Sequence, residues 1–199
     1  MKIVLASNNK GKLAELRAMF APLGLELIAQ GELGIGEAAE PFHTFVENAL
    51  AKARHAAAHS GLPALADDAG LCVDAFGGLP GVDTANYAPQ FGYEKGDHNN
   101  VRALLEQMRD TDNRRAALVS TLVAVRSPQD PEPLIAVGRV VGEITREPMG
   151  DNGFGFDPVM FIPEFGKTFA QLPPEVKNSA SHRGRAARSM LELMRECWL

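Results

Sequence analysis

The chain has 199 residues, of which 45% are hydrophobic, and a formal net charge of -5. Apolar residues occur along its whole length, which argues against disorder and favours one compact domain over residues 1–199. Sequence-independent binding to nucleic acid usually needs a basic surface, so we expect no nucleic-acid partner. Two cysteines are too few for a disulfide scaffold.

The start of the chain gives no sign of export or membrane insertion. The apolar run from Ile3 to Ala6 is too short for a signal peptide or a membrane span. We therefore expect a cytoplasmic protein with no membrane partner.

The hydrophobic pattern alternates between strand and helix periods. In chain order, the predicted elements are a strand at 2–6, a helix at 13–20, a strand at 25–29, a helix at 45–59, a short apolar run at 64–66, a strand at 71–73, a helix at 98–110, strands at 116–126, 134–144 and 159–162, and a helix at 183–196. The turn at 127–131 predicts a hairpin between its two neighbouring strands. This order predicts an α/β fold with a mixed sheet.

A polar turn connects the first strand to the first helix. Its residues are Ser7, Asn8, Asn9, Lys10, Gly11 and Lys12. Backbone N–H groups and the positive end of the helix would meet there and favour an anion, with Lys10 and Lys12 adding charge. The Walker phosphate-loop pattern is absent. The alternative is an ordinary capped helix with solvated lysines.

Adjacent carboxylates occur at Asp67 and Asp68, beside apolar residues. Burying them is costly without a partner, and magnesium (Mg2+) is typically held by one or two carboxylates. Successive strand residues point to opposite faces, so the two need not share a role. Glu40 is a candidate second ligand, and Lys52 is a candidate phosphate contact. The alternatives are a solvated Asp-Asp turn and plain surface charges.

Two further segments carry candidate base-binding groups. In the Gly-rich loop at 149–158, Phe154 could stack on a base and Asp157 could accept a hydrogen bond from a ring N–H. His182 and Arg183 stand at the start of the last helix, shortly after Lys177, as donors for base or phosphate oxygens. The alternatives are a β-turn with a core phenylalanine and a solvated basic pair.

Taken together, these segments resemble the inosine/xanthosine triphosphate pyrophosphatase family. The matching motifs are Ser7-x-Asn9-x-x-Lys12, Thr44-Phe45-x-Glu47-Asn48-Ala49-x-x-Lys52-Ala53, Ala66-Asp67-Asp68-x-Gly70-Leu71, Pro80-Gly81, Phe154-Gly155-Phe156-Asp157-Pro158, and Lys177 with Ser181-His182-Arg183-Gly184. The resemblance extends from Lys2 to about Met194. It implies an elongated two-lobed α/β fold with a long mixed central sheet flanked by helices, an active-site cleft between the lobes, and a homodimer.

The resemblance also implies residue roles. Asp68 would be the catalytic proton acceptor and a magnesium ligand, with Glu40 near the metal. The implied substrate-binding residues are Ser7 through Lys12, Lys52, Ala69, Phe154, Gly155, Phe156, Asp157, Lys177, His182 and Arg183. Ala69 stands where serine is common, so a hydroxyl contact is lost there while a backbone contact survives. Phe42 replaces a usual glycine and Phe156 a usual tyrosine or tryptophan.

The implied reaction is hydrolysis of non-standard purine nucleoside triphosphates (ITP, dITP and XTP) to the monophosphate and pyrophosphate. Donors at His182 and Arg183 with an acceptor at Asp157 suit the oxygen and the adjacent ring N–H of hypoxanthine and xanthine, and adenine offers the opposite pattern. Two alternatives remain at this point: a related pyrophosphatase for modified pyrimidine nucleotides, and a nucleotide-binding protein without turnover.

Overall fold

The computed structural model describes residues 1–199. Its strands and longer helices are β1 (Lys2–Leu5), α1 (Lys10–Phe20), β2 (Glu26–Ala29), α2 (Phe45–Ser60), β3 (Ala64–Val73), α3 (Asp97–Gln107), β4 (Arg115–Val125), β5 (Leu134–Ile144), β6 (Met160–Ile162), β7 (Lys167–Thr168), α4 (Pro174–Ala180) and α5 (His182–Cys197). None of the helices is long and apolar enough to cross a membrane.

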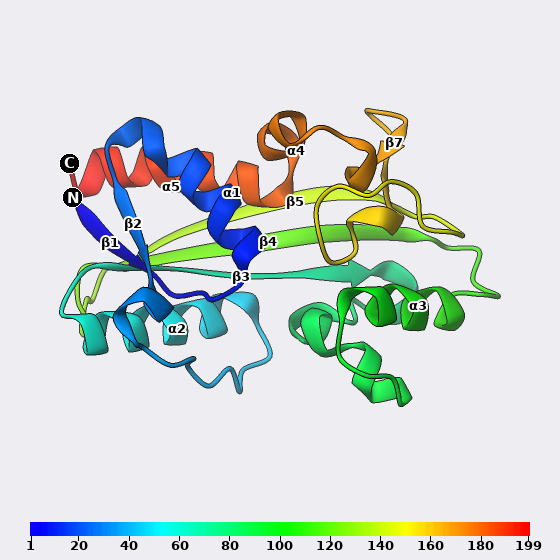
Figure 1. The fold of residues 1–199 in the computed structure, drawn as a ribbon, viewed down its shortest axis with the longest axis horizontal. Helices are drawn as coiled ribbons and strands as arrows, with labels where there is room; N and C mark the ends of the chain where they lie inside the picture. Colours follow the sequence, from blue (N-terminus) through cyan, green and yellow to red (C-terminus); the bar gives the residue numbers. More distant parts are fainter. The chain divides into compact units, whose positions relative to one another are not determined.

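The seven strands form one sheet in the order β2-β1-β3-β4-β5-β6-β7 (Figure 1). Strand β1 pairs in parallel with β2 and β3, whereas β6 pairs antiparallel with β5 and β7. The sheet is therefore mixed and flanked by helices, as the alternating pattern predicts. Strands β4 and β5 are neighbours, as the predicted hairpin requires.

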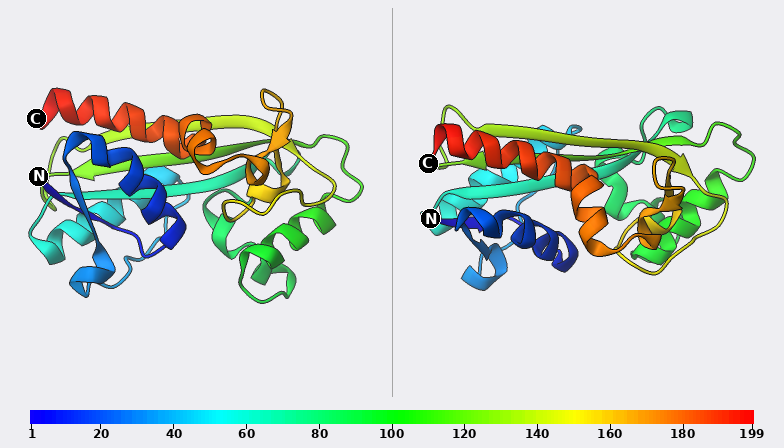
Figure 2. Two further views of the ribbon diagram at one scale, coloured as in Figure 1. Left: turned by 45° about the horizontal axis from the view of Figure 1, so that its top comes forward. Right: turned by 90° about the horizontal axis from the view of Figure 1, so that it is seen from above.

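The first compact unit comprises residues 1–68, 120–138 and 182–199. In this unit, α1 and α5 lie together on one face of the sheet and α2 lies on the other (Figures 1 and 2). Successive side chains of β1 point to opposite faces of the sheet, so this strand contributes to both cores. Ile3 packs against α1 and α5, whereas Val4 packs against the alanine-rich side of α2. Since α1 follows β1 directly, its first turn lies at the carboxyl edge of the parallel strands.

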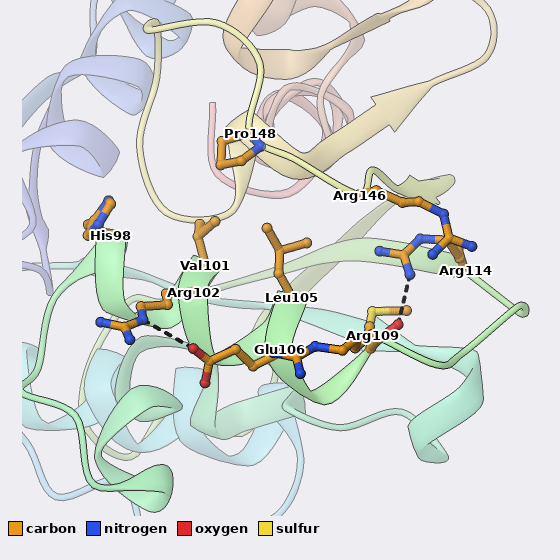
Figure 3. A pocket seen from close by; sticks show the side chains of 10 residues that line it. His98, Val101, Arg102, Leu105, Glu106, Arg109, Arg114, Arg146 and Pro148 are labelled. Atoms are coloured by element: carbon orange, nitrogen blue, oxygen red, sulfur yellow. Dashed lines mark hydrogen bonds and ion pairs between the residues drawn. The ribbon is translucent and has the colours of Figure 1, made fainter.

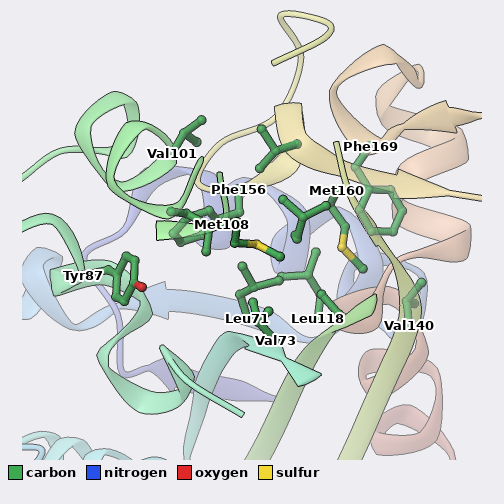
Figure 4. Close-up of a cluster of buried hydrophobic side chains, with 14 of the residues drawn as sticks. Leu71, Val73, Tyr87, Val101, Met108, Leu118, Val140, Phe156, Met160 and Phe169 are labelled. Atoms are coloured by element: carbon green, nitrogen blue, oxygen red, sulfur yellow. The ribbon is translucent and has the colours of Figure 1, made fainter. Parts of the chain in front are cut away.

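The second compact unit comprises residues 69–119 and 139–181. Its core is a separate cluster in which side chains from β3, β4, β5 and α3 pack with Phe156, Met160 and Phe169 (Figure 4). Phe156 is 3% exposed, so its ring is a core side chain. The predicted loop at 149–158 has neither helix nor strand up to residue 156, but its last two residues begin a short 3-10 helix, Asp157–Val159.

Strand β3 corrects one prediction. The sequence predicts an apolar run at 64–66 and a separate strand at 71–73, with a solvated Asp67-Asp68 turn as one alternative. Residues Ala64 to Val73 instead form one continuous strand of 10 residues. Asp67 is 1% exposed and Asp68 is 6% exposed. Carboxylates can be buried in a strand when cations and donors compensate their charge, and such partners are not visible in local sequence.

Two helix predictions also change. Helix α1 begins at Lys10, ahead of the predicted residue 13, because the Asn9 side chain caps it by accepting the Lys12 N–H. Helix α4 was not predicted, because its 7 residues, which begin at Pro174, carry no apolar repeat.

Candidate functional site

Asp67 is the centre of a buried charge network in the first unit. Its Oδ2 lies 3.0 Å from Arg183 Nη2 and 3.1 Å from Lys12 Nζ. Its Oδ1 accepts a 2.6 Å hydrogen bond from the Ser120 hydroxyl. Burial raises the pKa of Asp67, but the charges of Arg183 and Lys12 outweigh burial and hold the pKa well below its usual range. Asp67 is therefore a structural anion that aligns two cations from different helices.

Asp68 points to the opposite face of β3, where Ala66 packs against α2 and where Lys52 of α2 contacts the Asp68 carboxylate. Its Oδ1 accepts a 2.9 Å contact from Lys52 Nζ, which also lies 3.1 Å from Glu40 Oε2. Burial raises the pKa of Asp68, and this effect exceeds the opposing effect of Lys52. A carboxylate with a raised pKa is a better proton acceptor than an ordinary aspartate. The strand alternation predicted from sequence thus separates a structural carboxylate from a reactive one.

The arrangement around Asp68 suits a divalent cation. Asp68 Oδ2 is buried and has no hydrogen-bond partner. Lys52 already places a positive charge between Asp68 and Glu40, which indicates that the two carboxylates together favour a cation. No group of three acidic, histidine or cysteine ligands is present. Magnesium does not need one, because water and substrate phosphate usually supply most of its ligands.

The predicted anion loop joins this network. The Ser7 hydroxyl accepts the Asn9 N–H at 3.2 Å, and Asn8, Asn9 and Lys10 are exposed. Lys12 turns inward, and its Nζ lies 3.4 Å from the Asp67 carbonyl oxygen. Lys52 Nζ lies 3.1 Å from the same oxygen. Two lysines therefore converge on one point of β3, from α1 and α2. Positive charge at this point can bind phosphate oxygens.

Two residues that sequence reasoning missed position Arg183. Glu15, on α1, accepts a 2.6 Å ion pair from Arg183 Nη1. At Gly138, on β5, a Cβ atom would lie 1.9 Å from the His182 carbonyl oxygen, so only glycine lets the first turn of α5 approach this closely. Arg183 is 2% exposed as a result. Glycine in an apolar strand is the signal that could have revealed this contact.

The second unit holds another cluster of predicted site residues. Lys177 Nζ lies 2.6 Å from Asp157 Oδ2, which also accepts the Phe154 N–H at 2.9 Å. The same ammonium lies 4.7 Å from the centre of the Phe154 ring. Lys177, only 4% exposed, therefore holds the carboxylate and the ring in one arrangement. The structure thus brings together three residues for which the sequence predicts base and phosphate contacts.

The loop around this cluster depends on further contacts. A Cβ at Gly153 would lie 2.1 Å from Asp157 Oδ2, and its φ of 76° favours glycine. Gly155 donates its N–H to Asp97 at 2.8 Å, a residue at the start of α3 that sequence reasoning missed. Ala69 follows Asp68 in β3 and is partly exposed. The glycines are a local signal, whereas Asp97 is 58 positions away from its partner.

The model of the Ham1 family matches residues 3–193. The chain belongs to the Ham1 family. This membership agrees with the family resemblance read from the motifs, and the match covers every candidate residue named above.

Close relatives of this Ham1-family chain share a name. A protein from Albidiferax ferrireducens, named dITP/XTP pyrophosphatase, is 86% identical over 199 residues and the match covers 100% of both chains. A protein of the same name from Paracidovorax citrulli is 80% identical over 198 residues, again with 100% of both chains covered. A solved HAM1 protein from Coxiella burnetii has a TM-score of 0.90 at 41% identity and covers 99% of this chain and 100% of that chain.

Proposed function

We propose that this Ham1-family chain hydrolyses non-standard purine nucleoside triphosphates, of the inosine and xanthosine types, to the monophosphate and pyrophosphate. The observation that carries the proposal is Asp68, a buried carboxylate with a raised pKa and a free oxygen, placed beside two converging lysines. The names of the relatives point to the same substrates.

In this proposal, the phosphate chain binds where α1 and α2 meet β3. Lys12 and Lys52 bind phosphate oxygens and offset the charge that develops on the leaving pyrophosphate. The first turn of α1 adds backbone N–H donors beside the exposed residues Asn8, Asn9 and Lys10. Asp67 holds Lys12 in place during the reaction. The charge of Asp67 is compensated by its buried ion pairs with Lys12 and Arg183.

Asp68 is the proposed proton acceptor. Its carboxylate accepts the proton of the water that attacks the α-phosphorus, while Oδ1 stays in contact with Lys52. Asp68 and Glu40 would hold magnesium, which when bound supplies positive charge to the phosphates and to the attacking water. The fit rests on the unpaired Oδ2 and on the cation that Asp68 and Glu40 already share.

The base is proposed to contact the second cluster. The Phe154 ring offers a stacking surface, and its contact with Lys177 and Asp157 fixes its orientation. His182 and Arg183 remain proposed donors to base or phosphate oxygens, and contacts with Ala69, Gly155 and Phe156 would be made through their backbones. The homodimer and the cytoplasmic location stay predictions.

A pyrophosphate-release assay tests this proposal. The wild-type protein is compared on inosine, xanthosine, guanosine, adenosine and pyrimidine triphosphates, with and without magnesium. We expect preference for the inosine and xanthosine forms, dependence on magnesium, and loss of turnover in Asp68→Asn. Preference for adenosine triphosphate or for a pyrimidine would refute the base assignment, and near-normal turnover of Asp68→Asn would remove Asp68 from the mechanism.

A further inference from the structure

The second unit contains a cavity of about 490 Å³ that shares no residue with the two clusters described above. The cavity lies between α3 and the loop that follows β5 (Figure 3). Ligand sites in proteins typically have volumes of about 300–1,000 Å³. This cavity is therefore large enough for a small organic molecule.

One wall of the cavity is apolar. Val101 and Leu105 project from α3 toward Pro148 on the facing loop (Figure 3). Val101 is buried and Leu105 is partly buried, so this wall rests on the core of the unit. A flat or compact apolar group placed there would lose contact with water on both sides, which favours binding.

The end of the cavity near the start of β4 is basic, with the guanidinium groups of Arg114 and Arg146 close together (Figure 3). Arg114 is held rigidly. Its Nε and Nη2 donate to the carbonyls of Ile144 and Thr145 at 2.6 and 2.7 Å. Its Nη1 donates to the carbonyls of Met108 and Thr111 at 3.0 and 3.4 Å, which leaves one Nη2 N–H for a ligand. Because these carbonyls are neutral, they orient the guanidinium without cancelling its charge.

No carboxylate neutralises this basic end. Burial lowers the pKa of Arg114, and the nearby charge of Arg146 lowers it further. Arg146 is exposed and makes no ion pair. By contrast, Arg102 in the same cavity pairs with Glu106 at 3.1 Å. Two like charges held together without a counter-charge repel each other, and an anion between them removes that cost.

We propose that this cavity binds a phosphate monoester with a compact apolar body. The phosphate lies between Arg114 and Arg146, and the apolar body lies between Leu105 and Pro148. Arg146 can meet two phosphate oxygens with paired hydrogen bonds. Arg114 adds a fixed positive charge and its one remaining N–H, because backbone carbonyls accept its other four. The proposal does not depend on the hydrolase activity, because none of these residues takes part in it.

Phenyl phosphate is a suitable probe, with inorganic phosphate and phenol as its separate halves. Each is titrated into the full-length protein without magnesium, and binding is followed by calorimetry and by amide chemical shifts. We expect phenyl phosphate to bind at least about tenfold more tightly than either half, because both walls contribute. We expect the shifts to fall on residues 101–109 and 144–148.

A matched pair of variants tests the role of charge. Arg146→Ala removes an exposed side chain with no ion pair, so the fold should persist, and we expect phenyl phosphate affinity to fall at least about tenfold. Arg195→Ala removes an equal charge from an exposed position on α5, outside the cavity, and should leave the affinity unchanged. Unchanged affinity in Arg146→Ala, equal losses in both variants, or shifts confined to residues 7–12 and 153–157 would each overturn the proposal.

Discussion

Asp67 and Asp68 are neighbours in one strand, yet we expect their asparagine variants to behave in opposite ways. Asp67→Asn keeps the shape of the side chain but removes the carboxylate that pairs with Lys12 and one of the carboxylates that pair with Arg183. Both cations stay buried. Asp68→Asn instead removes a carboxylate whose Oδ2 is buried and has no hydrogen-bond partner.

The magnitudes follow from the partners. Removing one member of a buried ion pair costs about 3–5 kcal/mol. For a chain of this length, about 1 kcal/mol corresponds to roughly 2–4 °C, so we expect the melting temperature of Asp67→Asn to fall by about 6–20 °C. For Asp68→Asn, the lost contact with Lys52 is offset by relief of the buried charge, and Lys52 keeps Glu40. We expect its stability to change by less than about 1 kcal/mol.

Scanning calorimetry and urea unfolding of both variants measure this difference, and pyrophosphate release measures activity. We expect Asp68→Asn to melt near the wild type while losing orders of magnitude in turnover. Asp67→Asn should lose stability first. If Asp67→Asn melted within about 2 °C of the wild type, the buried network would not be the anchor that its contacts indicate. Equal destabilisation by both variants would contradict the separation of roles.

Three further predictions concern other contacts. Lys52→Met should lower kcat/KM by about 100-fold, because it removes a cation from the phosphate site; a wild-type value in steady-state assays would exclude that role. Gly153→Ala should cost about 1–3 kcal/mol in urea unfolding and raise KM, because its Cβ meets Asp157; an unchanged KM would argue against the base-binding role of this loop. Although burial raises the pKa of Asp130, two backbone N–H donors lower it below its usual value. Its contribution of about 1 kcal/mol is therefore present at neutral pH and is lost as pH falls below about 4, so the melting temperatures of wild type and Asp130→Asn should converge in acid. A constant difference across that range would refute the assignment.

Much of the local structure can be predicted from sequence because its causes are local. The Thr44 side chain caps α2 by accepting the Glu47 N–H, so the helix starts where predicted, and the apolar run at 2–6 forms β1. Asn9 shows where local reasoning fell short. Asparagine is a common helix cap, but this signal is weaker than the apolar repeat, so the start of α1 was placed at the repeat. The missed α4 has no such repeat at all.

The candidate site divides in the same way. Sequence alone determines which residue types are available, that two adjacent carboxylates would face opposite sides if they lay in a strand, and which family the motifs resemble. Only the tertiary structure decides that Asp67 is neutralised by Arg183, which lies 116 positions away, and that one oxygen of Asp68 stays unpaired. The physical reason is that burial and charge compensation depend on residues brought together by folding, and no local pattern records which distant side chain will meet which carboxylate.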